Sequence, residues 1–455
     1  MKDATNFNRR KFITALSAGS LGAVISSSLP VSAGILNQER GKLAILGGEP
    51  IRAKGRIGPE WPYVDDKVVE SMVKTTRSGI WSRIQSANGN VAVFEKEFAK
   101  SIGAGFSVGT GSGTQALSTC VEAMGIGAGD EVITSPYTDM GTISAILTSR
   151  ALPVLVDLDP DSYQLDPDEV EKRITKNTKA IMPVHIMGVP ANMERIMAIA
   201  KKHNLKVIED SCQAPFARYQ GKPIGTIGDL GCFSFQASKA IPCGEGGAVV
   251  GNDEALMEQV FTVHNRGASR KGSNETIGPK YRMNEFEGAM ALAQLTGAKE
   301  RFHQRNENAN YLSSRLKGFA GLVPQKHYQG TESGSYYHYA LTFHKEHWNG
   351  ADRSQFLKAI SAEGIGMGSY IRTGLHREPW VDHIINLKVY QSMYGKARLK
   401  AFKEGMDLPN CDRICNETLV SFWGSGTLLG TKAEMDAIIN GIMKVYENRD
   451  KLKAL

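Results

Sequence analysis

The chain of 455 residues has a formal net charge of +7 at pH 7 and is 41% hydrophobic and 22% charged, an ordinary globular composition. This length exceeds what one hydrophobic core usually supports, so we expect two domains, or one large α/β domain with an additional lobe. The positive charge is mild and no basic run dominates the chain, which argues against nucleic-acid binding. Six cysteines in so long a chain argue against a disulfide framework. Cys411 and Cys415 lack the further ligands of a zinc site, so no metal is expected.

Residues 1–33 have the pattern of an export signal. The pair Arg9-Arg10 precedes a weakly apolar run over residues 13–29, and Val31-Ser32-Ala33 offers the small residues of a signal-peptidase site. The paired arginines indicate the twin-arginine type, which carries folded proteins to the periplasm. Ser and Gly interrupt the apolar run too often for a permanent membrane span. If the pattern is instead a short amphipathic tail with two chance arginines, the protein would stay in the cytoplasm.

Strand and helix patterns then follow in order. Residues 43–50 predict a short strand and turn, and residues 65–76 and 91–101 predict helices. From residue 106 to residue 250, apolar runs alternate with helical patterns, which predicts an α/β fold with a mostly parallel sheet. A helical pattern over 281–316 predicts one long helix joining a large domain to a small one. A strand over 336–343 and helices over 353–363 and 432–447 predict an α+β lobe. The expected division is a signal at 1–33, a large domain at 34–285, and a linking helix with a small C-terminal domain at 286–455.

A small-residue turn lies between the strand at 106–110 and the next helix. It reads Gly109-Thr110-Gly111-Ser112-Gly113-Thr114. Glycines let the backbone approach a ligand, and free N–H groups together with the helix dipole favour an anion. The turn is therefore a candidate phosphate site, although similar turns also serve packing alone.

Two charges stand beside predicted strands farther along the chain. The apolar run at 205–208 ends in Glu209 and Asp210, and Lys239 lies between a strand and the glycine cluster at 244–247. A lysine amine can form a Schiff base with an aldehyde, and a carboxylate can keep a pyridine nitrogen protonated. Those are two principal duties of a protein toward pyridoxal phosphate. Taken separately, Asp210 could equally cap a helix and Lys239 could equally be a solvated surface side chain.

The ordered motifs resemble those of the DegT/DnrJ/EryC1/StrS family of pyridoxal-phosphate-dependent sugar aminotransferases. They are SGT (112–114), EDSCQA (209–214), GDLGCFSF (228–235), SK (238–239) and GEGGAVV (244–250). The resemblance runs from Leu43 to the C-terminus, through segments such as HIMGVPANM (185–193) and YRMNEFEGAMALAQL (281–295). It implies fold type I: a large domain with a mostly parallel seven-stranded sheet and a smaller α+β domain.

The resemblance also implies a role for each matching residue. Lys239 would form the Schiff base and shuttle a proton, Asp210 would pair with the pyridinium nitrogen, and Gln213 would lie near the phenolic oxygen. Gly113, Thr114 and Ser234 would hold the phosphate of pyridoxal 5'-phosphate. The family implies a homodimer with shared active sites. It also implies transfer of an amino group from an amino acid, glutamate or glutamine, to a keto sugar or keto-cyclitol.

Three positions depart from the family pattern. Asp139 stands where the family places an aromatic ring over the cofactor, and Tyr137 is a candidate to compensate. Lys280 replaces the family asparagine that reaches the phosphate of the second subunit, where it could act as a point charge. Phe216 replaces a small glycine and is expected to narrow the nearby space.

Two alternatives to the aminotransferase stay open, the first because of the predicted export and Asp139. One is an exported protein that binds cofactor or carbohydrate without turnover, and the other is a pyridoxal-phosphate-dependent sugar dehydratase, against which Lys239 argues. The sequence does not name the keto substrate. We expect it to contact the segments at 336–339 and 371–380, with Arg372 and His376 as candidates.

Overall fold

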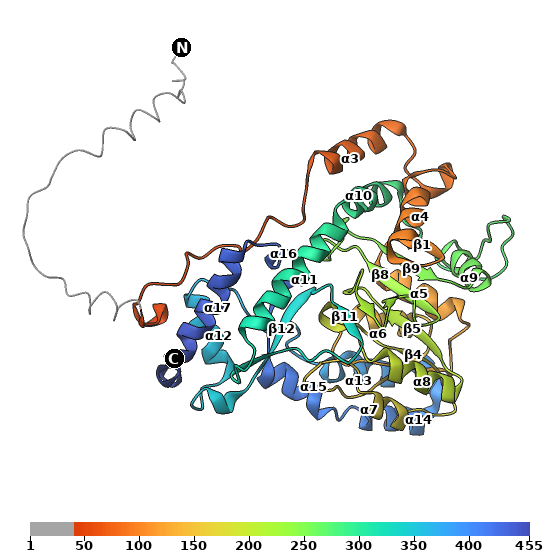
Figure 1. Ribbon diagram of the computed structural model, residues 1–455. Coiled ribbons are helices and arrows are strands. Elements are labelled where there is room, and N and C mark those ends of the chain that lie inside the picture. The colour runs from red at the N-terminus through yellow and green to blue at the C-terminus, as the bar shows by residue number, and fades with distance from the viewer. Residues whose placement is uncertain (1–40) are drawn as a thin grey trace, which may run out of the picture. The chain divides into compact units, whose positions relative to one another are not determined.

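The computed structural model describes residues 41–455, of which Leu43–Leu455 form one compact unit (Figure 1). The predicted export signal lies outside the described residues, and the predicted boundary between residues 285 and 286 stays a prediction. In the described part of the chain, no helix combines the length and the apolar content that a membrane crossing requires.

The unit is built on a seven-stranded sheet with the order β1–β9–β8–β5–β4–β2–β3. Strand β9 is antiparallel to both neighbours, while all other neighbours run parallel, which confirms the predicted mostly parallel sheet. The strands are β1 (Phe106–Thr110), β2 (Glu131–Thr134), β3 (Leu152–Leu155), β4 (Thr178–Met182), β5 (Lys206–Asp210), β8 (Leu230–Ser234) and β9 (Gly247–Gly251).

Alternate strand residues face opposite sides of this sheet, and helices cover both sides. Val132 of β2 packs in the core with α5, α6 and α9, whereas its neighbour Ile133 packs in the core with α7 and α8. A cluster of phenylalanines joins α4 and α10 to β8 and β9. The helices are α3 (Asp66–Ser78), α4 (Asn90–Ile102), α5 (Gly113–Ala123), α6 (Met140–Thr148), α7 (Pro167–Lys172), α8 (Met193–His203), α9 (Glu254–His264) and α10 (Glu285–Leu295).

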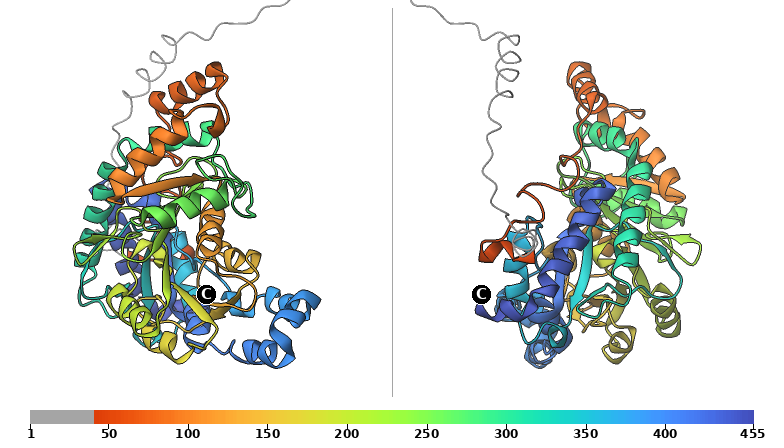
Figure 2. Two further views of the ribbon diagram at one scale, coloured as in Figure 1. Left: turned by 90° about the vertical axis from the view of Figure 1, so that its right-hand side faces the viewer. Right: turned by 60° about the vertical axis from the view of Figure 1, so that its left-hand side comes forward.

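The C-terminal part has its own antiparallel sheet and core. The sheet order is β10–β12–β13, and α11, α12 and α17 pack around it, with α11 and α17 side by side (Figure 2). Leu43 and Ile57 also pack in this core, so residues from the start of the unit belong with its end. The elements are β10 (Leu322–Pro324), β12 (His338–Phe343), β13 (Leu419–Trp423), α11 (Ala298–Arg315), α12 (Arg353–Ala362) and α17 (Lys432–Glu447).

Shorter elements complete the unit. A core of apolar side chains joins α13 and α14 to α6 and β3. These elements are α13 (Trp380–Asn386), α14 (Lys388–Glu404), α15 (Pro409–Arg413), the π-helix η6 (Ile414–Thr418), α16 (Gly424–Thr427), and a small sheet of β6 (Arg218–Tyr219), β7 (Lys222–Pro223) and β11 (Thr331–Ser333). Short 3-10 helices are η1 (Ala44–Leu46), η2 (Arg83–Gln85), η3 (Ile186–Gly188), η4 (Lys345–His347), η5 (Leu375–Arg377) and η7 (Arg449–Ala454).

Two predicted elements are wrong. The predicted strand at 43–50 is the 3-10 helix η1, which Gly47 ends with a left-handed φ of 90°. The predicted single helix over 281–316 is two helices, α10 and α11, because Thr296 is extended and Gly297 has a φ of 77°. The other helices and strands named from the sequence are confirmed, with ends that differ by a few residues.

Candidate active site

A cavity of about 440 Å³ lies at the carboxyl ends of β5 and β8 and beside the amino terminus of α5. In open α/β sheets this edge is where ligands bind. Of the residues predicted from the sequence, the cavity contains Gly113, Thr114, Asp139, Asp210, Gln213, Ser234 and Lys239. It is lined by Ser112, Gly113, Thr114, Leu117, Thr138, Asp139, Gly141, Thr142, Asp210, Cys212, Gln213, Ser234, Gln236, Ser238, Lys239, Glu245, Tyr337 and Tyr370.

The predicted phosphate turn leads into α5. Ser112 caps this helix, since its hydroxyl accepts a hydrogen bond from the Gln115 N–H at 3.1 Å. Gly113 and Thr114 are the first two helical residues, so their N–H groups have no acceptor within the helix. A Cβ atom on Gly113 would lie only 2.7 Å from the Cβ of Ser234. The absence of a side chain at Gly113 therefore leaves space beside these two N–H groups and the Ser234 hydroxyl, which suits an anion.

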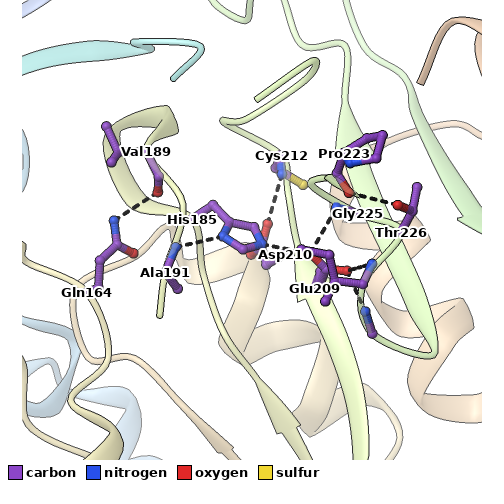
Figure 3. A network of polar contacts seen from close by, with 12 residues as sticks. Gln164, His185, Val189, Ala191, Glu209, Asp210, Cys212, Pro223, Gly225 and Thr226 are labelled. Carbon is purple, nitrogen blue, oxygen red and sulfur yellow. Dashed lines mark hydrogen bonds and ion pairs between the residues drawn. The ribbon is translucent and has the colours of Figure 1, made fainter. Parts of the chain in front are cut away.

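Asp210 is the last residue of β5 and is 4% exposed. The hydroxyl of Thr142, on α6, donates to its Oδ2 at 2.7 Å. The N–H of Cys212 donates to its Oδ1 at 3.2 Å, as Figure 3 shows. These two bonds orient the carboxylate at the cavity wall before any ligand binds.

Lys239 lies in the turn between β8 and β9. Its main-chain N–H donates to the carbonyl of Gln236 at 2.8 Å, which holds the turn. The Nζ atom lies 4.1 Å from the centre of the Tyr337 ring, in a cation–π contact. The hydroxyl of Tyr337 lies 2.9 Å from the Ser238 hydroxyl, which fixes the ring in place. The C-terminal part of the chain thus holds the amine at the centre of the cavity.

Gln213 and Tyr370 form the next part of the wall. Gln213 accepts a hydrogen bond from the Met187 N–H at 2.8 Å and donates to the Tyr370 hydroxyl at 3.2 Å. Burial raises the pKa of Tyr370 well above its usual range, and the nearby Tyr337 and Asp139 act in the same direction. Tyr370 therefore keeps its proton, and its O–H remains available as a donor.

His338 packs behind this wall with its ring centre 4.3 Å from that of Tyr370. Burial lowers the pKa of His338 to about 3, and the positive charge of Lys239 acts in the same direction. The imidazole is therefore neutral near pH 7, and Lys239 is the only basic side chain that lines the cavity among the described residues. Three carboxylates line it, those of Asp139, Asp210 and Glu245.

Asp139 has a structural role as well as its place in the cavity. It caps α6 by accepting a hydrogen bond from the Gly141 N–H at 2.8 Å. Tyr137 does not compensate for the absent aromatic ring, because its side chain is fully buried outside the lining and its hydroxyl accepts from the Ile371 N–H. Tyr337 and Tyr370 supply the aromatic surface instead.

Four further predicted residues lie away from the cavity. Phe216 packs against Phe302 in the core, so the expectation that it narrows the site is wrong. The imidazole of His376 is buried and lies 3.0 Å from the Asp412 carboxylate. Arg372 and Lys280 are exposed and do not contribute to the lining within one chain.

Sequence reasoning missed several lining residues. Thr142, Gln236, Ser238 and Tyr370 were not singled out, although Thr142 holds Asp210 and Tyr370 holds Gln213. The only signal for Tyr370 was its position directly before residues 371–380, the segment expected to contact substrate.

The sequence profile of the DegT/DnrJ/EryC1/StrS aminotransferase family matches residues 63–421. The chain is 33% identical to the L-glutamine:scyllo-inosose aminotransferase of Streptomyces griseus, over 89% of this chain and 98% of that protein. It is 32% identical to the L-glutamine:2-deoxy-scyllo-inosose aminotransferase of Micromonospora echinospora, over 90% of this chain and 99% of that protein. The crystal structure of 3-amino-5-hydroxybenzoic acid synthase superposes with a TM-score of 0.74 at 29% identity, over 88% of this chain and all of that one.

Proposed function

The chain belongs to the DegT/DnrJ/EryC1/StrS aminotransferase family and acts as a transaminase, and we propose that it transfers an amino group from L-glutamine to a keto-cyclitol. The observation that carries the proposal is that one cavity holds Lys239, Asp210 and the start of α5 together. The names of the relatives support glutamine as donor and a cyclitol ketone as acceptor.

The residues present fit pyridoxal 5'-phosphate as cofactor. The Gly113 and Thr114 N–H groups and the Ser234 hydroxyl form a cradle that a side chain at position 113 would fill. Asp210 would hold the ring nitrogen, Gln213 would face the phenolic oxygen, and Lys239 would hold the aldehyde carbon. When bound, the cofactor supplies an electron-withdrawing ring and an aldehyde that carries the amino group between donor and acceptor.

Three side chains would have separate roles in the transfer. Lys239 would remove the proton from the donor carbon and return one to the acceptor carbon, as a positioned general base and acid. The Asp210 carboxylate, held by Thr142, would keep a positive charge beside it throughout. Tyr337 would keep the Lys239 amine directed into the cavity.

The substrate side supports an acceptor without a diphosphate group. Once the α5 cradle is assigned to the cofactor phosphate, no Arg and no second Lys lines the cavity within the described chain. A nucleotide diphosphate would find carboxylates, Asp139 and Glu245, where it needs cations. The rings of Tyr337 and Tyr370 suit the apolar face of a six-membered ring, and Gln236 and Asp139 suit its hydroxyls.

A spectroscopic screen tests the proposal. Purified protein with pyridoxal phosphate is mixed with glutamine, and the lysine-linked absorbance band should bleach and then return when scyllo-inosose is added, with an amine product found by mass spectrometry. Amine formation only from a nucleotide-linked keto sugar would overturn the acceptor class. A band unchanged by glutamine and glutamate would overturn transfer itself and favour the binding protein.

We also propose a homodimer in which Lys280 of one copy reaches the cavity of the other. Exposed apolar side chains on and after α3 support a covered surface: Val69 is 52% exposed, Trp81 51% and Ile84 68%. Mixing inactive Lys239→Ala and Lys280→Ala proteins should restore activity through mixed dimers. A monomer by light scattering would contradict this proposal.

Export remains a proposal, supported by Arg9-Arg10 and the Val31-Ser32-Ala33 site. Cell fractionation should find the protein in the periplasm, and Arg9→Lys with Arg10→Lys should retain it in the cytoplasm. Equal cytoplasmic retention of the unmodified protein would contradict export.

A further inference from the structure

A fully buried histidine–carboxylate pair lies directly behind the predicted cofactor residues. The His185 and Glu209 side chains are 0% exposed, and His185 Nε2 lies 3.1 Å from Glu209 Oε2 (Figure 3). Glu209 immediately precedes Asp210 on β5, but its side chain does not line the cavity. The functions assigned above use neither residue of this pair.

The hydrogen bonds around the pair show which atoms donate and which accept. The Ala191 N–H donates to His185 Nδ1 at 3.0 Å, so Nδ1 is the acceptor and Nε2 carries the ring proton. Glu209 also accepts the N–H groups of Gly225 at 2.9 Å, Ile227 at 2.7 Å and Gly228 at 2.7 Å. With the His185 ring N–H, four N–H donors therefore satisfy the buried Glu209 carboxyl group.

The pair anchors a turn that ends beside the cavity. The imidazole joins the far end of the turn, through the Ala191 N–H, to Glu209 on β5. The main-chain N–H of His185 also donates to the carbonyl of Asp210 at 3.1 Å. Two residues later Met187 has a left-handed φ of 64°, an uncommon conformation for a side chain of this kind. This conformation directs the Met187 N–H toward Gln213 Oε1, at 2.8 Å.

The Met187 N–H determines which way the Gln213 amide faces. A backbone N–H can only donate, so the amide oxygen must face the turn and the NH₂ group must face Tyr370 and the cavity. If the turn relaxed, Met187 could leave the left-handed region and the amide would be free to rotate. In part of the molecules the Gln213 amide oxygen, an acceptor, would then face the cavity in place of the NH₂ donor.

We infer that His185, held by Glu209, is a positioning residue that orients the Gln213 amide toward the bound cofactor. This inference rests on the proposed function, because it assigns the Gln213 NH₂ group to the cofactor's phenolic oxygen. Loss of that donor weakens binding of the ionised oxygen and makes its protonation easier.

The test uses the full-length protein and two cofactor measurements besides activity. His185→Leu keeps apolar bulk but removes both ring nitrogens. The dissociation constant for pyridoxal phosphate should rise about tenfold, and the pH midpoint of the bound-cofactor absorbance should shift by about one unit. His185→Gln should restore both values to within about threefold and about half a unit, because its amide can accept from Ala191 and donate to Glu209.

Two further comparisons separate positioning from general stability. The control is Glu131, another fully buried carboxylate, which binds Arg398 and Thr175 at the amino-terminal end of β2, away from the cavity. Glu131→Gln should leave the cofactor dissociation constant and the pH midpoint unchanged. In a Gln213→Ala background, His185→Leu should change neither value further. Where His185→Leu does not fold, Glu209→Gln is measured in its place and should give the same shift.

The inference would be overturned if His185→Leu changed neither the cofactor dissociation constant nor the pH midpoint. It would also be overturned if His185→Leu shifted both equally in the presence and absence of Gln213. Either result would leave the proposed function intact. A wild-type protein with no lysine-linked absorbance band would instead overturn the proposed function.

Discussion

The two sides of the cavity are built differently. The cofactor side consists of strand ends and a helix start in the large sheet, and its key groups are held by main-chain or buried partners, such as Thr142 for Asp210. The acceptor side consists of side chains on connecting segments, Tyr337 and Tyr370 from the C-terminal part and Asp139 before α6. The first side has little freedom to change without losing the fold, whereas the second can change its side chains alone. We therefore expect that substitutions can change the choice of substrate without changing the cofactor chemistry.

The largest expected effect is on the cofactor side. Lys239→Ala removes the only amine that lines the cavity in the described chain, so turnover should fall by about a thousandfold or more and the lysine-linked absorbance band should disappear. Stopped-flow assays and absorbance spectra measure both. Lys172→Ala, an exposed lysine paired with Glu169, serves as the matched control. A retained band would contradict the assignment.

Asp210→Asn should lower turnover about a hundredfold. The asparagine keeps the shape of the side chain and can still accept from Thr142, but it carries no charge to stabilise a protonated ring nitrogen. Steady-state rates with saturating cofactor check this, and Asp168→Asn on the exposed surface is the control. Rates within threefold of wild type would remove Asp210 from the catalytic role.

The stability of the folded protein should fall in acid. Burial, with the charge of Arg83, lowers the pKa of His264 from 6.5 to about 3, and His338 beside Tyr370 is lowered to about 3 as well. Between these values the unfolded chain binds a proton that the folded chain does not, so unfolding becomes easier as pH falls from 6.5 toward 3. Each histidine should contribute up to about 1.4 kcal/mol per pH unit.

Denaturant unfolding at pH 5 and pH 7 measures this effect in the wild type and in His264→Gln and His338→Gln. Each substitution should reduce the decrease in the free energy of unfolding between pH 7 and pH 5. An unchanged difference for either variant would show that this histidine is protonated in the folded protein.

The smallest expected effect is a change in the KM for the acceptor without a matching change in cofactor affinity. Tyr370→Phe removes a hydroxyl that can donate into the cavity and that holds Gln213, so the KM for the keto acceptor should rise about fivefold. Cofactor affinity should stay within about twofold, because Met187 still orients Gln213. Tyr394→Phe, whose hydroxyl bonds to the Asp130 and Arg150 carbonyls, is the control. An equal rise in the cofactor dissociation constant would show that the two sides are not separable.

Most of the large sheet could be predicted from the sequence, since apolar runs between residues 106 and 250 alternated with helical patterns. The misassigned segments were those where one glycine decided the outcome, as at Gly47 and Gly297. A left-handed glycine changes the chain direction without altering the hydrophobic pattern around it, so periodicity alone does not reveal it.

For the site, the ordered motifs of the sequence predicted that Gly113, Asp210 and Lys239 belong together, because they resemble the family's motifs, and the cavity contains all three. The tertiary structure decided which of the other predicted residues reach the cavity. It placed Tyr370 beside Tyr337 there and kept Tyr137 and His376 out, and behind the cofactor residues it joined His185 to Glu209. These contacts depend on how the C-terminal part and the loops pack onto the sheet. That packing brings together residues that are far apart in the chain, and local sequence patterns do not predict such contacts.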